Sequence, residues 1–116
     1  MLNYLKNKLS STKFDRDALR DATIAALKTV FDPEIPVNIY DLGLIYLVEI
    51  DAEAKATINM TLTTPGCPVA QTFPATVENV VRAVPGISDV NLSLVWDPPW
   101  TQDQMSDAAK LQLGLI

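Results

Sequence analysis

Residues 44–63 read LIYLVEIDAEAKATINMTLT, and this stretch decides the fold. Its first part, Leu44 to Ile50, is rich in branched and aromatic side chains, which favour β-strands. In its second part, Ala56 to Thr63, apolar and polar residues alternate as in a strand with one buried face. The segment DAEAK between them is polar and short, so we predict a β-hairpin.

On the amino-terminal side of the hairpin, the sequence predicts a helix over residues 15–31. The segment Thr12-Lys13-Phe14-Asp15 has the pattern of a helix start. Asp32 precedes Pro33 and is expected to end the helix, because the residue before a proline is pushed out of the α region. We interpret residues 1–11 as a loosely ordered leader, residues 32–43 as a connector and residues 12–116 as one domain. The apolar stripe of the helix is Leu19, Ala22, Ala26, Leu27 and Val30.

On the carboxyl-terminal side, a second helix is predicted over about residues 68–84. Pro74 either kinks this helix or moves its regular start to a later residue. A third strand is expected near residues 90–95, and the pattern from Thr101 to Gln104 predicts a helix over about 102–112 that Gly114 would cap. The order α-β-β-α-β-α predicts an α+β fold, with a three-stranded sheet and helices mainly on one face.

The chain has 116 residues, no histidine and a single cysteine, Cys67. The lack of an imidazole base excludes Ser-His-Asp and Cys-His catalysis. One cysteine and no histidine also exclude a structural zinc site within one chain and an intrachain disulfide.

The net charge of −5 is unevenly distributed along the chain. Residues 1–31 hold six basic and three acidic residues, whereas residues 32–116 hold three basic and eleven acidic ones. An acidic body repels phosphate backbones, which argues against a nucleic-acid partner. No apolar run approaches the roughly 20 residues that span a membrane, and the first residues lack a secretory apolar region. A cytoplasmic protein with a free thiol is the expectation.

Cys67 is the first candidate functional residue. It lies between a predicted strand and a predicted helix start, where free N–H groups and the helix dipole favour the thiolate. A thiolate would serve as a nucleophile or as a metal ligand, whereas a buried cysteine would only pack. Thr64 is a candidate because its hydroxyl could bond a thiolate or an anion, or could instead form a turn.

Carboxylates in the connector and a tryptophan pair complete the candidates. Asp32, Glu34 and Asp41 could bind a hard cation or act as acid and base, or could bond their own backbone and shape the loop. In WDPPWT (96–101), we expect Trp96 in the core, and Trp100 is a candidate partner-binding residue that could equally lie over the core.

Three strings together resemble the iron–sulfur (metal–sulfur) cluster assembly domain family, and within it the SufT-like branch. The strings are DPEIPVNIYDLGLIY (32–46), TLTTPGCP (61–68), and WDPPWT (96–101) followed by MSDAAKLQLGL (105–115). The resemblance implies an accessory factor or carrier in the maturation of iron–sulfur proteins, with an assembly scaffold and client proteins as partners. By position, the resemblance places the site residues at Asp32, Glu34, Asp41, Thr64 and Cys67, in two loops that would converge at one end of the sheet.

A cluster usually takes four protein thiolates, and this chain has one. The chain therefore holds no cluster firmly with its own cysteines. Three arrangements remain open: a homodimer that shares a cluster, transient use of Cys67 as a metal ligand during transfer, or no contact with metal. The alternatives to a carrier are an adaptor that docks the assembly machinery onto clients, and an accessory protein of the phenylacetate-degradation type. Enzymatic activity is not expected.

Overall fold

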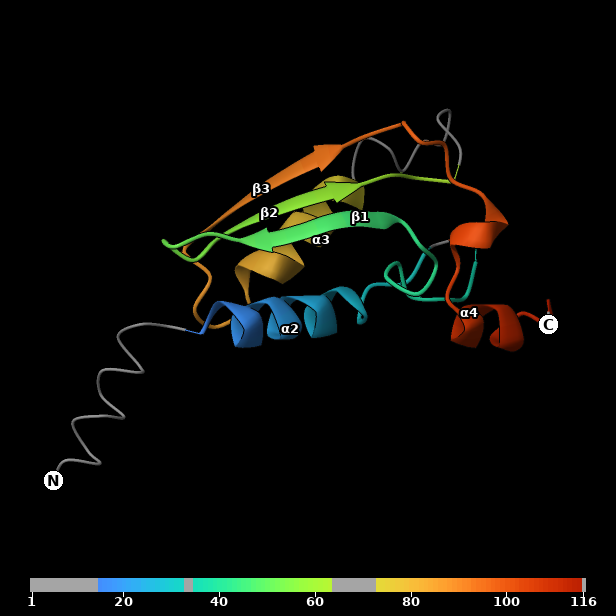
Figure 1. The fold of residues 1–116 in the computed structure, drawn as a ribbon, viewed down its shortest axis with the longest axis horizontal. Coiled ribbons are helices and arrows are strands. Elements are labelled where there is room, and N and C mark those ends of the chain that lie inside the picture. Colours follow the sequence, from blue (N-terminus) through green and yellow to red (C-terminus); the bar gives the residue numbers. More distant parts are fainter. Residues whose placement is uncertain (1–14, 33–34, 64–72, 116) are drawn as a thin grey trace, which may run out of the picture.

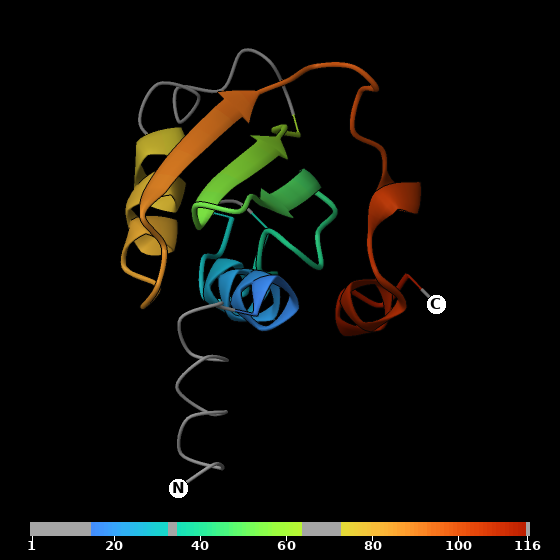
Figure 2. The ribbon, with the colours of Figure 1, turned by 60° about the vertical axis from the view of Figure 1, so that its left-hand side comes forward.

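A computed structural model describes residues 15–32, 35–63 and 73–115 of the chain. The strands form one sheet in the order β1-β2-β3, with β1 antiparallel to β2 and β2 parallel to β3. Helices α2 and α3 cover one face of the sheet, and α4 stands beyond its end (Figure 1, Figure 2). The predicted α+β fold class is confirmed. The elements follow the chain as α2 (Arg16–Leu27), β1 (Ile45–Ile50), β2 (Lys55–Met60), α3 (Phe73–Arg82), β3 (Asp89–Leu94), the 3-10 turn η2 (Gln102–Gln104) and α4 (Asp107–Gln112).

The predicted hairpin is confirmed by the pairing of β1 with β2. Its turn is held by Asp51, whose Oδ1 accepts hydrogen bonds from the backbone N–H groups of Glu53 and Lys55, each at 2.9 Å. Ala54 completes the reversal with a φ of 64°, in the left-handed region. The Asp51 carboxylate therefore adds two hydrogen bonds to the backbone bonds of the turn, which run from Asp51 N–H to Lys55 and from Ala54 N–H to Asp51.

Helix α2 begins with Asp15 as its cap, because the Asp15 carboxylate accepts from the N–H groups of Asp17 and Ala18. Thr12 lies outside the described residues. The helix ends at Leu27, so the predicted stop at Asp32-Pro33 is wrong. The chain leaves the helix early because residues 30–32 pair with residues 37–39, through bonds from Ile39 N–H to Val30 and from Asp32 N–H to Val37. This pairing competes with further helical turns.

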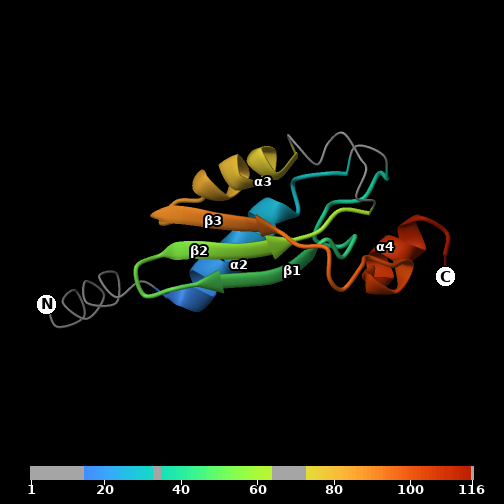
Figure 3. The ribbon, with the colours of Figure 1, turned by 90° about the horizontal axis from the view of Figure 1, so that it is seen from above.

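Within the described residues, α3 begins at Phe73, so Pro74 lies in its first turn. A proline is tolerated there because the first N–H groups of a helix have no intrahelical acceptor. Residues 64–72 lie outside the described part of the chain, so the choice between a kink and a later start stays a prediction. Strand β3 follows at Asp89–Leu94, close to the predicted range, and α3 runs opposite to β2 and β3 (Figure 3).

The single helix predicted over residues 102–112 is wrong, because two short elements occupy this range. Met105 separates η2 from α4 with an extended backbone and buries its side chain in the core. Ser106 then caps α4, as its Oγ accepts from the N–H of Ala109. The predicted terminator is correct: Gly114 has a φ of 75° and its N–H bonds to the carbonyl of Leu111.

The core lies between the sheet and the helices α2 and α3. Ile58 and Met60 of β2 are fully buried on the helix-covered face, while Thr57 and Asn59 alternate with them on the open face. Burial of this face against two helices is the main source of stability. No helix in residues 15–32, 35–63 and 73–115 combines the length and the apolar character needed to cross a membrane. The fully buried aliphatic side chains include Leu27, Val37, Ile39, Leu42, Leu44, Val77 and Val81.

Candidate functional site

The connector between α2 and β1 holds two of the predicted site residues, Asp32 and Asp41. The Oδ1 atom of Asp32 accepts a hydrogen bond of 2.9 Å from the N–H of Ile35. The Oδ2 atom of Asp41 accepts one of 2.8 Å from the side-chain amide of Asn38, whose Oδ1 accepts in turn from the Asp41 N–H at 2.9 Å. Both carboxylates therefore shape the connector, which is the local role that their positions in turns favoured.

Three of the predicted site residues, Glu34, Thr64 and Cys67, lie outside the described residues. Residues 61–63 and Phe73, which flank the segment 64–72, are described. The N–H of Thr61 donates to the carbonyl of Leu44 at 2.8 Å, which fixes the end of β2 beside the start of β1. The connector that carries Asp41 and the chain that leads toward Cys67 therefore emerge at the same end of the sheet.

A third segment, residues 95–106, closes over this end of the sheet. The N–H of Val95 donates to Met60 at 2.7 Å, and the N–H of Ser106 donates to the carbonyl of Asp41 at 2.8 Å. Tyr46 joins β1 to this segment. Its hydroxyl donates to the carbonyl of Pro98 at 2.7 Å and accepts from the side-chain amide of Gln104 at 2.8 Å. The described segments around residues 41, 61 and 100 therefore lie at one end of the sheet. The convergence of the predicted site residues stays a prediction, because Glu34, Thr64 and Cys67 lie outside the described residues.

The sequence did not reveal Tyr46 and Gln104 as the residues that connect these segments. Tyr46 was counted among the strand residues of the hairpin, and Gln104 only as part of a helix start. The available signal was the one aromatic side chain of this strand, a tyrosine near its start, because a partly buried phenol usually finds a hydrogen-bond partner for its hydroxyl.

The two tryptophans differ in burial, and only Trp96 departs from what the sequence favoured. Trp96 is 40% exposed, so its predicted place in the core is wrong. Trp100 is partly buried against the core, and its Nε1–H donates to the carbonyl of Leu42 at 2.8 Å. The chain turns away from the sheet directly after β3, so Trp96 has no core to enter. Whether Trp100 also contacts a partner stays a prediction.

Among the residues that the structure describes, no group of three or more Cys, Asp and Glu side chains is placed to hold a metal ion. Asp32 and Asp41 alone offer two carboxylates, each already engaged in the loop. A large cleft lies elsewhere, between α2 and the outer side of β1. The described residues of the connector therefore offer two carboxylates, those of Asp32 and Asp41, each held by hydrogen bonds within the connector.

Comparisons with known proteins agree on one family. The family model described as iron–sulfur cluster assembly protein matches residues 20–94. An Fe-S protein maturation auxiliary factor of Porphyromonas gingivalis is 46% identical over 93 residues, which are 80% of this chain and 89% of that protein. The Fe-S protein maturation auxiliary factor SufT of Staphylococcus aureus is 44% identical over 86 residues, which are 74% of this chain and 98% of that protein.

The same fold has been seen in a solved structure. The crystal structure of a domain of unknown function, DUF59, from Bacillus anthracis matches with a TM-score of 0.79 and 38% sequence identity. The match covers 87% of this chain and 96% of that chain, so it includes the sheet and the helices together.

Proposed function

The chain belongs to the family of iron–sulfur cluster assembly proteins, and from this premise we propose that it is an accessory factor that helps to transfer clusters to client proteins through Cys67. The names of its relatives, which are auxiliary factors of Fe-S protein maturation, support the accessory role. The use of Cys67 is our own step beyond them. It rests on chemistry, because Cys67 carries the only thiol in the chain.

One observation supports a site at this end of the sheet. The bond from Thr61 N–H to the carbonyl of Leu44 brings the two chain segments together at 2.8 Å. The segment 64–72 leaves from Thr63 and returns at Phe73, whose helix starts at that same end (Figure 3). We propose that Cys67 and Thr64 work beside Asp41, with Asp32 and Glu34 on the connector completing an acidic rim.

A lone thiol suits transfer better than storage. Clusters usually have four protein ligands, so one cysteine leaves most positions to a scaffold or a client. In the proposed step, the Cys67 thiolate bonds to one iron as a scaffold thiolate leaves it, and a client thiolate then displaces Cys67. No oxidation or reduction takes place in this ligand exchange. The protein is not an enzyme in this scheme, it works in the cytoplasm and it holds no cluster permanently.

Replacement of Cys67 by serine tests the proposal. The assay measures transfer of a cluster from a loaded scaffold protein to an apo-client, followed by the activity of the client. The Cys67→Ser variant is expected to lose the acceleration that the wild type gives. A matched control carries Cys67→Ser together with Ser93→Cys, which keeps one thiol per chain but moves it to exposed residue 93. The control should be as inactive as the single variant.

Full activity of a folded Cys67→Ser protein would remove the carrier role and leave the adaptor role. An adaptor is the second candidate because the described part of the chain has several exposed large apolar side chains, which suit contact with other proteins. Circular dichroism of each variant separates loss of function from loss of fold. These exposed side chains are Phe31, Trp96, Leu111 and Leu115, at 55%, 40%, 67% and 45% exposure.

A further inference from the structure

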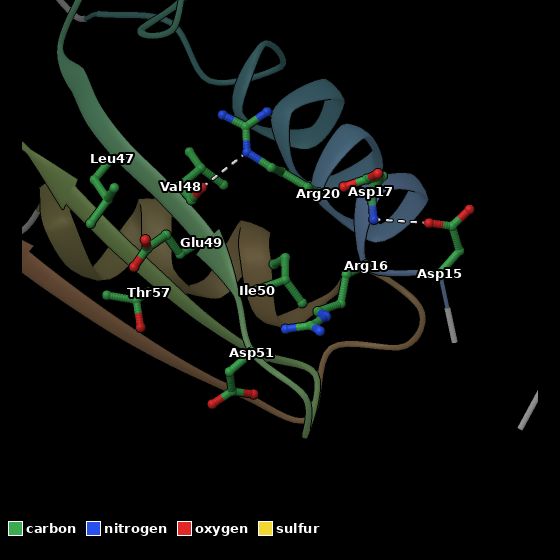
Figure 4. Close-up of a pocket in the computed structure, with 10 residues that line it drawn as sticks. All are labelled: Asp15, Arg16, Asp17, Arg20, Leu47, Val48, Glu49, Ile50, Asp51 and Thr57. Atoms are coloured by element: carbon green, nitrogen blue, oxygen red, sulfur yellow. Dashed lines mark hydrogen bonds between the residues drawn. The ribbon is translucent and has the colours of Figure 1, made fainter. Parts of the chain in front are cut away.

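A cleft of about 840 Å³ lies between α2 and the outer side of β1 (Figure 4). Its walls are the first half of α2, from Asp15 to Arg20, and the second half of β1, from Leu47 to Asp51. This part of β1 adjoins the hairpin turn, at the opposite end of the sheet from residues 61–63, which lead toward Cys67. The cleft is therefore separate from the site proposed above, and its occupant does not depend on the function proposed there.

The lining of the cleft is acidic on balance. Four carboxylates and two guanidinium groups line it, which leaves a net charge of −2. An acidic segment, or the same wall of a second copy, is therefore repelled, whereas a basic segment is attracted. The carboxylates belong to Asp15, Asp17, Glu49 and Asp51, and the guanidinium groups to Arg16 and Arg20.

Both arginines are directed at groups of the cleft itself. The Nε–H of Arg20 donates to the carbonyl of Val48 at 3.0 Å, as Figure 4 shows. Backbone N–H groups of the hairpin turn lower the pKa of the Asp51 carboxyl most, and the charges of Lys55 and Arg16 lower it further. Arg16 therefore compensates Asp51, which leaves the other carboxylates of the lining without a matching cation.

Two of these carboxylates are open to a cation from outside, one on each wall. Asp17 lies on the helix wall and Glu49 on the strand wall, and both are exposed (Figure 4). Within the described part of the chain, neither carboxylate accepts a hydrogen bond or forms an ion pair. Asp15 differs from them, because its Oδ1 caps α2. An ammonium group that enters the cleft thus finds a free carboxylate on either side.

The chain itself carries a basic segment next to the cleft. Residues 1–14 lie outside the described residues and directly precede Asp15, which lines the cleft. They read MLNYLKNKLSSTKF, with three lysines and no acidic residue. The seven residues from Lys8 to Asp15 span up to about 23 Å, whereas the strand wall from Leu47 to Asp51 is about 14 Å long. This amino-terminal segment can therefore reach both walls, and its attachment keeps its local concentration on the order of millimolar.

The hand of the fold indicates that the amino-terminal segment binds through its side chains and not as a fourth strand. Helix α2 runs opposite to β1, so a chain that lay along β1 before entering α2 would run parallel to β1 (Figure 1). Helices α2 and α3 cover the same face, but β1 runs opposite to the strands that α3 connects (Figure 2, Figure 3). Because the β2-α3-β3 connection is right-handed, a connection through α2 to β1 would be left-handed, which parallel strands almost never show.

We propose that the chain's own amino-terminal segment lies in this cleft, with Lys6 and Lys8 toward the carboxylate of Glu49. Each exposed ion pair is weak, but the segment is tethered at the rim of the cleft, so weak contacts are enough to hold it there. The bound segment covers the outer edge of β1, where the N–H groups of Val48 and Ile50 point away from β2. It thereby shields an edge on which a strand of another protein could pair.

The test uses the full chain and a carbodiimide, which joins a lysine amine to a carboxylate that it contacts. Lys6 or Lys8 should be joined to Glu49 about fivefold more often than to Glu53, as mass spectrometry of the digested protein measures. Glu53 is the matched control, because it is exposed in the adjoining hairpin turn but does not line the cleft. The preference should disappear in about 1 M NaCl, which screens exposed charges.

Two further measurements identify the occupant. In a mixture of unlabelled and isotope-labelled protein, the cross-links should form within one chain. Lys6→Gln combined with Lys8→Gln should shift the amide NMR signals of residues 47–51. Lys28→Gln combined with Lys110→Gln removes the same charge elsewhere on the chain and should leave these signals in place.

Four outcomes would overturn the proposal. Equal cross-linking of Glu49 and Glu53 would show that the amino-terminal segment has no preferred place. Cross-links between different chains would make a second copy the source of the bound segment. A preference that persists in about 1 M NaCl, or an equal response of the β1 signals to both double variants, would show that the lysines do not hold the segment in the cleft.

Discussion

Trp100 and Trp96 lie four residues apart in the sequence and have different surroundings. Trp100 packs partly against the core and donates from Nε1 to the carbonyl of Leu42, at 2.8 Å. Leu42 is fully buried, so its carbonyl depends on this indole for a donor. Trp96 is 40% exposed. One indole therefore stabilises the fold, whereas the other leaves apolar surface open to contacts.

Trp100→Phe is expected to lower the free energy of unfolding by about 2 kcal/mol. The change keeps an aromatic ring but removes the donor, and a buried acceptor without a donor costs about 1–3 kcal/mol. Urea denaturation followed by circular dichroism measures this loss. Trp96→Phe is the matched control, because this side chain is largely at the surface, and it should change stability by no more than about 0.5 kcal/mol. Equal losses in both variants would contradict the assignment.

At the scale of the element, the β1–β2 turn shows how one carboxylate fixes a hairpin. The N–H groups of Lys55 and Glu53 both donate to Asp51, and these bonds hold the pKa of the Asp51 carboxyl below its ordinary value of 3.8. The folded state therefore binds a proton at Asp51 less readily than the unfolded chain. The stability that this carboxylate contributes is complete above its unfolded pKa of 3.8 and is lost as the pH falls through the lower folded pKa.

Asp51→Asn is therefore expected to make the free energy of unfolding depend less on pH in the acid range. The free energy of unfolding of the wild type should fall more steeply below about pH 4 than that of the variant, because only the wild type loses a carboxylate acceptor by protonation. Thermal unfolding across that pH range gives the two slopes. Glu53→Gln is the matched control, because it removes a carboxylate from the same turn. The Glu53 side chain accepts no bond from the described residues, so this variant should keep the wild-type slope.

Elements with a clear period were predictable, and their ends were not. The alternation of Ile58 and Met60 with polar residues reports a buried face, so the sequence identified β2 correctly. The end of α2 depends on pairing between residues 30–32 and 37–39, which no local pattern encodes. The helix predicted over 102–112 is divided in two because Met105 is buried in the core with an extended backbone. A single apolar residue in the sequence does not indicate whether its backbone is helical or extended.

At the scale of the whole molecule, one end of the sheet is assembled from three distant segments. The sequence predicted that the loops around Asp41 and after Thr63 would meet, because strands of a hairpin begin and end side by side. It did not predict the third segment, whose contacts run through Tyr46 and Gln104. Such contacts join residues 58 apart, so only the folded chain defines them. The position of the connector beside the end of β2 was therefore predictable from the hairpin, whereas the contacts of residues 95–106 with both were not.

Gly43 is the position where two of these segments approach most closely. It has a φ of 87°, and a Cβ added there would clash with the backbone carbonyl of Gln104. Gly43→Ala should therefore lower the free energy of unfolding by on the order of 3 kcal/mol, because a backbone cannot yield as a flexible side chain would. Gly114→Ala provides the control: its φ of 75° is equally left-handed, but nothing lies within 4 Å of the new atom. Its cost should be near 1 kcal/mol, from the conformation alone.

The difference between the two glycine variants isolates the contact between residues 43 and 104 from backbone strain. Chemical denaturation of both proteins measures it. The fluorescence of Trp100, which bonds to neighbouring Leu42, shows where the structure has loosened when it is recorded in a Trp96→Phe background, which leaves Trp100 as the one tryptophan of the chain. If the backbones of residues 43 and 104 are held in close contact, Gly43→Ala should change this fluorescence and Gly114→Ala should leave it unchanged. Similar losses in both variants would mean that residues 95–106 can move away from the connector, and that the enclosure around Asp41 is not fixed by the fold.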